Sequence, residues 1–418
     1  MEMIADLHVH SRHAAACSEM LTLENIEAAA VQKGIDIIGT GDFTHPAWMS
    51  EIKSKLEEHS GGVYKLRGGK GIRFVLTSEV CTIFESGGKV RKVHNCMIAP
   101  GIEDAVAVSE LLSKRGDLKS DGRPIISASS AELVDIAKSV SDKFVVYPAH
   151  VWTPWFGALG ASSGFDSISE AYEDRSGSIF AFETGLSSDP AMNWRVSMLD
   201  KYSQISGSDA HSLPNIGREA TVFSFEDGKP VDYNAIYRGI RGENLKMTFE
   251  FYPEEGKYHY DGHRKCNVSL KPDEAMKYNN ICPRCRRKLT VGVLHRVEEL
   301  ADRDEGAIPE NAKGYVHIIP LMEIIASVKG VGKSSALVRR LYMEFIGKFS
   351  SEMHVLNDAD ISELESVDKE TACAIGNVRE GKISIKAGYD GVFGEIDVSG
   401  KKAGLDMKGG IQKRMNDF

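Results

Sequence analysis

The sequence lacks long apolar runs, a regular set of cysteines and an excess of positive charge. No hydrophobic stretch approaches the roughly 20 residues that a membrane-spanning helix needs, so we do not expect the chain to cross a membrane. Its seven cysteines are odd in number and widely scattered, which argues against a disulfide framework and favours the reducing cytoplasm. The net charge of −9 would by itself argue against binding to nucleic acid.

What the sequence does contain is an ordinary globular composition with one basic segment. Hydrophobic residues make up 42% and charged residues 27% of the 418 positions, which suffices for a sizeable core and for two or three domains. Residues 262–296 carry nine Lys or Arg against two acidic residues, a local net charge of +7. This segment predicts a phosphate-binding face, with a solvated charged surface as the alternative for any one side chain.

Two histidines and a carboxylate follow the first apolar run. Asp6, His8 and His10 alternate along a predicted strand, so their side chains should share one face. A similar pair, Asp209 and His211, follows another apolar run. A half-buried position on a sheet edge would be the simpler interpretation of a single histidine, but two such pairs indicate one metal site assembled from distant segments. Imidazole and carboxylate ligands suit zinc or manganese better than calcium.

Residues 1–255 alternate short apolar runs with amphipathic segments, the pattern of repeated βα units. The helix predicted at Thr22–Lys33 begins with a Thr cap and stops at Gly34. Seven strands with intervening helices favour an α/β barrel, in which the chemistry gathers where strands end. The strand candidates are Ile4–Val9, Ile35–Gly39, Ile72–Thr77, Val90–Ile98, Phe144–Ala149, Ile179–Phe182 and Gln204–Ser206.

Ligand-type side chains stand in or just after every predicted strand. Such a coincidence would be odd for a purely structural barrel, and a polynuclear metal centre accounts for all of them together. Beyond His8 and His10, these candidates are Asp42, His45, Glu79, His94, His150, Glu183, Asp209 and His211.

The same motifs resemble those of the PHP superfamily, named for polymerase and histidinol phosphatase. The likeness rests on Asp6–Ser11, Thr40–His45, Glu79, His94, Pro148–His150 and Ser208–His211. It implies a distorted seven-stranded barrel with three metals. By position, it implies a first metal on the predicted catalytic residues His8, His10, Glu79 and Asp209, a second on Glu79, His94 and His150, and a third on His45 and His211. His13 and Asp42 are the candidates for a further ligand of the third site.

An aromatic loop, Trp152–Gly157, directly follows His150. Core packing is one interpretation of its rings, but its Pro and Gly favour a loop at the mouth of the site, where a ring could stack on a base. The predicted DNA-binding and base-binding residues are Trp152, Trp155, Tyr172, Asn193, Arg195, Arg218, Arg286 and Lys333.

Four metal-ligand residues mark a small second domain, predicted at 256–305. Two residues separate His263 from Cys266, two separate Cys282 from Cys285, and fifteen lie between the two pairs. This spacing is typical of a closed structural zinc site. His295 and His259 are the substitutes for the histidine ligand. A thioredoxin-like redox pair is the competing interpretation, weakened by the missing βαβ context.

Residues 306–395 predict a helical domain around a glycine-rich turn. Helices at Ile318–Ser327 and Ala336–Phe345 flank Gly330-Val331-Gly332. A Walker A loop is excluded because Ser327 stands where its first glycine is required. A helix-hairpin-helix, which offers backbone amides to a DNA phosphate, is favoured over an ordinary helical hairpin.

The last segment, 396–418, is basic and glycine-rich and predicts a flexible tail. Gln412, Met415 and Phe418 have the spacing of a peptide that binds a sliding clamp. This motif names a possible protein partner besides DNA.

The order of barrel, zinc module and Gly-x-Gly hairpin resembles the endonuclease Q family, DNA-repair enzymes mainly of archaea. Further likeness lies in His150–Gly157, Glu183–Trp194, Asp261–Cys266, Gly292–Arg303 and Gly388–Gly391. It implies a metal-dependent endonuclease, cytoplasmic and nucleoid-associated, that cuts single- or double-stranded DNA 5′ to uracil, hypoxanthine, xanthine or an abasic site. Expected cofactors are Zn²⁺ in the module and barrel, with Mg²⁺ or Mn²⁺ as the alternatives in the active site. The alternative functions are a small-molecule phosphatase and an inactive DNA-binding module.

Overall fold

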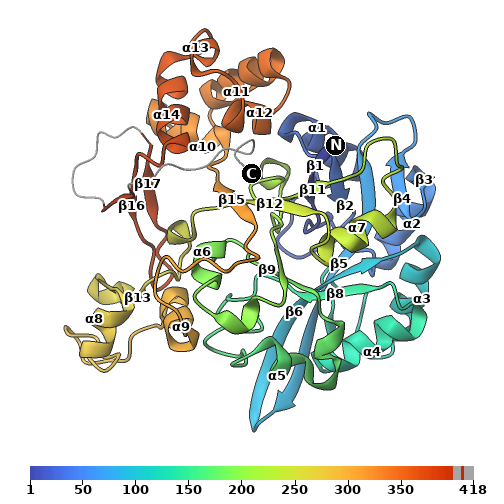
Figure 1. The fold of residues 1–418 in the computed structure, drawn as a ribbon, viewed down its shortest axis with the longest axis horizontal. Coiled ribbons are helices and arrows are strands. Elements are labelled where there is room, and N and C mark those ends of the chain that lie inside the picture. The colour runs from blue at the N-terminus through green and yellow to red at the C-terminus, as the bar shows by residue number, and fades with distance from the viewer. Residues whose placement is uncertain (399–405, 409–418) are drawn as a thin grey trace.

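A mixed sheet of eleven strands forms the centre of the molecule (Figure 1). The structure is a computed structural model that describes residues 1–398 and 406–408. The sheet has the order β15-β12-β11-β1-β2-β5-β4-β3, with β6 and β7 paired to β5 and β8 paired to β6. These strands are β1 Glu2–Asp6, β2 Ile37–Gly39, β3 Leu56–Ser60, β4 Val63–Leu66, β5 Arg73–Ser86, β6 Lys89–Ala99, β7 Ile125–Ile126, β8 Val145–Pro148, β11 Ala220–Ser224, β12 Leu245–Glu250 and β15 Gly314–His317.

All seven predicted strands are present, as β1, β2, β5, β6, β8, β9 and β10. Hydrogen-bonded ladders join the first five, whereas β9 (Ala181–Glu183) and β10 (Ser203–Ile205) form a separate parallel pair. A single β-bridge between Val9 and Ala210 links the segment that follows β1 to the segment that follows β10. The mixed α/β architecture is confirmed, and closure into a seven-stranded barrel stays an interpretation of these partly connected ladders.

Local sequence signals place the first helix as predicted. Thr22 Oγ1 accepts a hydrogen bond from Asn25 N at the start of α1 (Leu23–Lys33), and Gly34 ends it with φ 85°. In the described residues, no helix is both long and apolar enough to span a bilayer. The other helices around the sheet are α2 Pro46–Lys55, α3 Ile102–Leu112, α4 Ser130–Val140, α5 Ile168–Tyr172, α6 Pro190–Asn193 and α7 Tyr233–Ile240.

The basic segment forms a small module beside the sheet (Figure 1). It consists of β13 (Asp261–His263), β14 (Val268–Leu270), α8 (Pro272–Lys277) and α9 (Val293–Leu300). Its own apolar cluster contains only Val268, Ala275, Cys282 and Leu289. So few buried side chains supply little stability on their own, and small domains of this kind are usually stabilised by a metal or by disulfides.

The C-terminal region is helical, as expected, and is built onto the central sheet. The strand β15 at its start pairs with β12, and the ion pair of Lys33 Nζ with Glu352 Oε2, 2.7 Å long and almost fully buried, fastens it to α1. Its helices are α10 Leu321–Lys329, α11 Ala336–Phe349, α12 Glu352–Asn357, α13 Ile361–Leu364 and α14 Lys369–Arg379, followed by the strands β16 Ile383–Lys386, β17 Glu395–Asp397 and β18 Asp406–Lys408.

The first of these helices begins three residues later than predicted. Pro320 occupies its cap position, and Ile318 N donates to Glu250 O, so the residues before Leu321 stay extended along the sheet. The clamp-binding motif at Gln412, Met415 and Phe418 lies outside the described residues.

Candidate metal centre

Four of the predicted ligands converge at one end of the sheet. His8, His10, Glu79 and Asp209 offer ligand atoms that all lie within 4.8 Å of one another. His10 Nε2 lies 3.0 Å from Asp209 Oδ1 and 3.5 Å from Glu79 Oε2. His8 Nε2 lies 3.7 Å from Asp209 Oδ1 and 3.8 Å from Glu79 Oε2. Two imidazoles and two carboxylates therefore face one small volume.

Two further carboxylates orient the histidines. Glu183 Oε2 lies 2.8 Å from His8 Nδ1, and Asp42 Oδ1 lies 3.0 Å from His10 Nδ1. Each Nδ1–H therefore donates outward, which turns the lone pair of Nε2 toward the centre, as in carboxylate–histidine–metal arrangements. His8 Nε2 is buried and makes no hydrogen bond to any described residue. A divalent cation among these four ligands would supply the missing partner, so the donor set fits a metal.

A second group adjoins the first through Glu79. Its Oε1 lies 2.6 Å from His94 Nδ1 and 3.0 Å from His150 Nε2. The two imidazole nitrogens lie 3.3 Å apart. All three side chains are buried and form a separate metal-ligand cluster. Glu79 is therefore shared between two adjoining candidate sites.

The protonation of these groups reflects their crowding. Burial alone would raise the pKa of Glu79, but the neighbouring His94, His150 and His8 hold that pKa well below its usual value. Burial opposes a charge on His10, yet Asp42 and Asp209 raise its pKa to about 10. The carboxylates are thus ionised and ready to bind a cation, which would compete with protons for the imidazoles.

Strained backbone accompanies the centre. Asp42, His150 and Asp209 have φ values of 47°, 29° and 46°, although none is glycine. Residues in this left-handed region cost on the order of 1–3 kcal/mol each and cluster at functional sites. Asp6 supports one of them, because it accepts hydrogen bonds from Ser208 N and Gly217 N at 3.0 and 2.9 Å. Asp6 therefore supports the Ser208–Asp209 loop.

The predicted third site is not assembled. No metal-ligand group within residues 1–398 and 406–408 contains His45, His211 or Asp42. His45 caps α2 by accepting from Trp48 N, and its Nε2 lies 3.2 Å from Lys119 O, while its ring stacks on His13. These local contacts involve both ring nitrogens of His45, and Asp42 orients His10. A third metal on His45 and His211 stays a prediction.

The structure also shows a cluster that the sequence did not reveal. Cys96 Sγ lies 3.8 Å from Glu183 Oε2, and these two residues with His8 form a further buried group of ligand-type atoms. Burial raises the pKa of the Cys96 thiol to about 12. The cluster lies behind His8, and a strand-paired cysteine carries no sequence signal that would have singled it out.

A pocket of about 380 Å³ opens onto both candidate metal sites. Asp209, His211, His94 and His150 form one part of its wall, and the loops at Asp121–Ile125, Thr153–Phe156 and Gly185–Ser187 contribute the rest. Arg123, which no sequence motif indicated, lies within this wall with Nη1 3.4 Å from Glu79 Oε2.

Three of the predicted base-binding residues are corrected because they are fully buried. Trp152 donates from Nε1 to Asn193 Oδ1 at 2.6 Å, and Tyr172 donates to Asn95 Oδ1 at 2.5 Å. Trp152, Tyr172 and Asn193 therefore offer no face or edge to a base. Trp155, by contrast, is 41% exposed and packs edge to face on Tyr258 with ring centroids 4.8 Å apart.

The predicted basic residues have different surroundings. Arg195 pairs with Glu298 at 2.7 Å and is largely buried. Arg218 donates to Ser208 O at 2.9 Å and to Asp209 O at 3.3 Å, so it supports the loop that carries Asp209. Arg286 is exposed. Lys333 is 65% exposed and pairs with Glu323 at 3.2 Å. Only the last two are free to meet a duplex from solvent.

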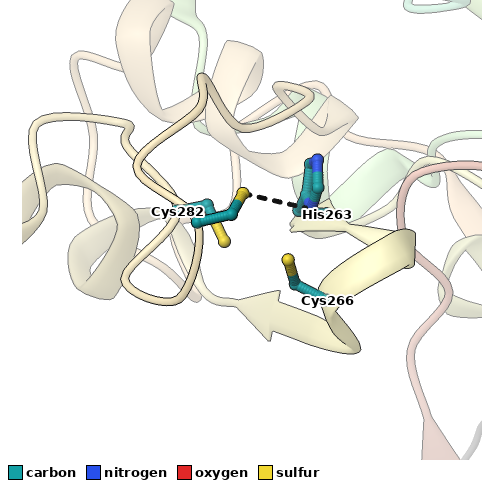
Figure 2. A group of neighbouring side chains, drawn as sticks. His263, Cys266 and Cys282 are labelled. Atoms are coloured by element: carbon teal, nitrogen blue, oxygen red, sulfur yellow. Dashed lines mark hydrogen bonds between the residues drawn. The ribbon is translucent and has the colours of Figure 1, made fainter.

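The four residues predicted to bind structural zinc come together in the small module. His263, Cys266, Cys282 and Cys285 offer atoms within 4.8 Å of one another, and Figure 2 shows the labelled side chains turned toward a common centre. Cys285 Sγ lies 3.8 Å from His263 Nδ1. The substitute His295 instead contacts Asp261 Oδ2 at 2.6 Å, so His263 is the histidine of this group.

Comparisons with known sequences cover most of the chain. The family described as the MJ0043 C-terminal domain matches residues 320–382. The chain is 34% identical over 257 residues to uncharacterized protein MJ0043 of Methanocaldococcus jannaschii, a match to 60% of this chain and 32% of that protein. It is 29% identical over 415 residues to uncharacterized protein YqxK of Bacillus subtilis, covering 94% of this chain and 99% of that one.

Comparison with solved structures is more specific. The crystal structure of the lesion-specific endonuclease PfuEndoQ from Pyrococcus furiosus matches with a TM-score of 0.84 and 31% identity over 95% of both chains. An endonuclease Q complex with a 27-mer duplex, which has an abasic lesion at the active site, matches with the same score and identity over 95% of this chain and 96% of that one. The fold and the site thus define a hydrolase of phosphodiester bonds. The chain belongs to the endonuclease Q family.

Proposed function

We propose that the chain is a metal-dependent DNA-repair endonuclease that cleaves the phosphodiester bond on the 5′ side of a deaminated base or an abasic site. The observation that carries this proposal is the sharing of Glu79 between two metal-ligand groups, each of which reaches the wall of one pocket, the first through Asp209 and the second through His94 and His150. The endonuclease Q structure with an abasic duplex at its active site supports the choice of substrate. Cleavage would leave 3′-hydroxyl and 5′-phosphate ends.

Cations in this centre would lower the pKa of a bound water toward neutrality and neutralise phosphate oxygens. The ligand residues would be His8, His10, Glu79 and Asp209 for one cation and Glu79, His94 and His150 for the other. The proposal includes Zn²⁺ in the four-residue module and Zn²⁺, Mg²⁺ or Mn²⁺ in the catalytic centre. It also includes closure of the seven strands into a PHP-type barrel, in which these ligands project from one end.

The protein's own groups hold this centre in one geometry. Glu183 and Asp42 keep the imidazoles of His8 and His10 in the tautomer that binds through Nε2. Arg218 fixes the strained turn at Asp209 through two carbonyl oxygens. Cys81 lines the pocket, but burial raises the pKa of its thiol to about 12. A thiolate nucleophile is thereby disfavoured, and hydrolysis by water is the mechanism that we propose.

Base selection would depend on hydrogen-bond donors in the pocket. Deamination replaces an exocyclic amine with a carbonyl acceptor. Thr153, Ser187 and the backbone amides beside Gly185 line the pocket and are candidate donors. A normal cytosine or adenine would place an amine donor against them, and an unsatisfied buried group costs about 1–3 kcal/mol. An abasic site would enter without this penalty.

The duplex would reach the pocket across a basic and aromatic surface. Trp155 is exposed beside the pocket residue Phe156, and its partner Tyr258 precedes the zinc module. Arg284, Arg286, Arg287 and Lys288 are exposed on that module. The exposed turn at Gly332–Ser334, which follows the left-handed cap of α10 at Gly330, would contact phosphates through its amides, because the amides of Gly330 and Val331 already donate to carbonyls of α10. These contacts position DNA without reading its sequence.

A cleavage assay with single lesions tests the proposal. The protein is incubated with Mn²⁺ or Mg²⁺ and labelled duplexes that contain one uracil, hypoxanthine or abasic site, next to an intact duplex and p-nitrophenyl phosphate. Incision 5′ to the lesion is expected. Asp209→Ala should abolish cleavage and leave binding of the lesion duplex largely intact, whereas the exposed control Asp174→Ala should cut normally. Hydrolysis of p-nitrophenyl phosphate without incision of any duplex would contradict the proposal.

A further inference from the structure

Arg123 contributes a permanent positive charge to the pocket. Among the residues that line the pocket in the described part of the chain, it is the only Lys or Arg. Its side chain is 26% exposed, and its Nη1 lies 3.4 Å from Glu79 Oε2, the oxygen that faces His8 and His10. The guanidinium thus lies beside the carboxylate shared by both candidate metal sites.

The backbone that carries Arg123 is fixed by its neighbours. Asp121 Oδ1 accepts hydrogen bonds from Arg123 N and from Ala15 N, each at 3.0 Å. Gly122 N donates to His13 O at 2.9 Å. A Cβ at Gly122 would lie 2.5 Å from Asp42 Oδ2, so only glycine lets this loop pass so close to the carboxylate that orients His10. The loop therefore presents Arg123 from a defined position.

The guanidinium is only weakly engaged by the protein itself. A charge-assisted N–H to carboxylate bond is usually about 2.7–2.9 Å long, and the contact with Glu79 is 3.4 Å. The remaining N–H groups of Arg123 donate to no residue within 1–398 and 406–408, and they are not sealed from solvent. Glu79 also contacts four histidines, which are the other candidate metal ligands. A cation bound by these residues would compete with Arg123 for the oxygens of Glu79. The N–H groups of Arg123 would then be available to another anion.

We propose that Arg123 is a catalytic residue that donates to a nonbridging oxygen of the phosphate that is cleaved. The inference rests on the proposed endonuclease function, because it takes the anion in the pocket to be the scissile phosphodiester. Arginine suits this task because its planar fork pairs with two oxygens and keeps its charge at every working pH. The contact would orient the phosphate toward the centre and stabilise the charge that develops on it.

A binding cycle with the bound metals left in place tests this contact. Binding of an abasic duplex is measured by fluorescence anisotropy for the chain with its native Arg123 and for Arg123→Ala, both carrying Asp209→Ala so that neither cuts the duplex. A second duplex carries a neutral methylphosphonate at the scissile linkage, and a third carries it one linkage away. With the native chain, neutralising the scissile linkage should weaken binding by about tenfold or more, the scale of one charge-assisted hydrogen bond.

Arg123→Ala should bind the ordinary abasic duplex about tenfold or more weakly than the native chain does. A methylphosphonate at the scissile linkage should then weaken its binding little further. The modification one linkage away should cost both proteins equally. Arg123→Lys should recover part of the affinity, and Arg175→Ala, which removes an exposed arginine paired with Asp135, should bind like the native chain. Arg123→Gln repeats the cycle if the alanine variant does not fold.

If the methylphosphonate at the scissile linkage weakened binding equally for the native chain and for Arg123→Ala, the inference would be overturned. The endonuclease function would still stand. A native chain that binds lesion and intact duplexes equally and cuts neither would overturn the proposed function, and with it the role of Arg123.

Discussion

Glu183 Oε2 lies 2.8 Å from Nδ1 of His8, and both side chains are fully buried at one end of the sheet. The carboxylate comes from the end of β9, and the imidazole follows β1. Burial opposes a charge on His8, but Cys96 and Glu183 raise its pKa well above the usual value. Glu183 therefore orients His8. Together with Cys96 it also makes the imidazole more basic, and a more basic imidazole binds a cation more strongly.

We expect Glu183→Gln to weaken metal binding at the first site. An amide is a poorer acceptor for Nδ1–H than a carboxylate, and loss of such a partner lowers metal affinity or activity by about 10- to 100-fold. Metal titration by calorimetry should show the weaker site, and incision of the abasic duplex should recover at high metal concentration. Glu57→Gln, at an exposed position, is the control. Unchanged affinity in the Glu183 variant would show that this hydrogen bond has no influence on the metal site.

Two tryptophans three positions apart should behave in opposite ways. Trp155 is exposed, so Trp155→Ala should leave the melting temperature nearly unchanged and weaken lesion-duplex binding by about 1–3 kcal/mol, the scale of base–aromatic stacking. Trp152 is buried and bonded to Asn193, so Trp152→Ala should destabilise the fold by about 3–5 kcal/mol. Thermal unfolding and anisotropy measure the two effects. Full DNA affinity of the Trp155 variant would exclude a stacking role.

These two residues also show what the sequence can predict. The alternation of His8 and His10, which lie just after β1, predicted that they share one face, and their ligand atoms lie in one group. The Thr22 and Gly34 signals gave the ends of α1, because caps depend on local backbone geometry. Whether Trp152 or Trp155 is buried depends on Asn193 and Tyr258, which lie far away in sequence. No local pattern contains that information.

The same distinction applies within the candidate metal centre. Glu79 and Asp209 were predictable as acidic groups after apolar runs. Arg123 was not, because its position depends on the contact of the Asp121 loop with Ala15 and His13. His45 also caps the next helix, α2, a use of a histidine after a strand that no local pattern distinguishes from metal binding.

We expect the small module to depend on its metal. Cys282→Ala should remove about one zinc ion per chain and unfold the module, because the apolar cluster around Cys282 is too small to hold it. The exposed arginines would then lose their arrangement, and the salt dependence of binding to an undamaged duplex should become less steep. Cys373→Ala, at an exposed cysteine outside the cluster, is the control. Elemental analysis and titrations at several salt concentrations measure both effects, and a module that stays folded without zinc would refute this dependence.

The buried carboxyl of Glu250 should make stability fall as pH rises. Burial raises its pKa to about 8 from an ordinary value of 4.5, although Thr184 and Ser206 donate to its Oε2 at 2.9 and 3.2 Å. Between these values the folded chain keeps a proton that the unfolded chain has released. The stabilisation is therefore complete below pH 4.5 and is lost as pH rises through 8.

Glu250→Gln cannot ionise, so its free energy of unfolding should decline less over this range. The difference between the two proteins should change by on the order of 2–4 kcal/mol between pH 5 and pH 8.5, since one pKa unit corresponds to about 1.4 kcal/mol. Urea unfolding at several pH values measures it, with the exposed Glu85→Gln as the control. Curves for the native chain and Glu250→Gln that stay parallel across the range would mean that Glu250 is ionised in the folded protein, with Ser206 and Thr184 compensating for its burial.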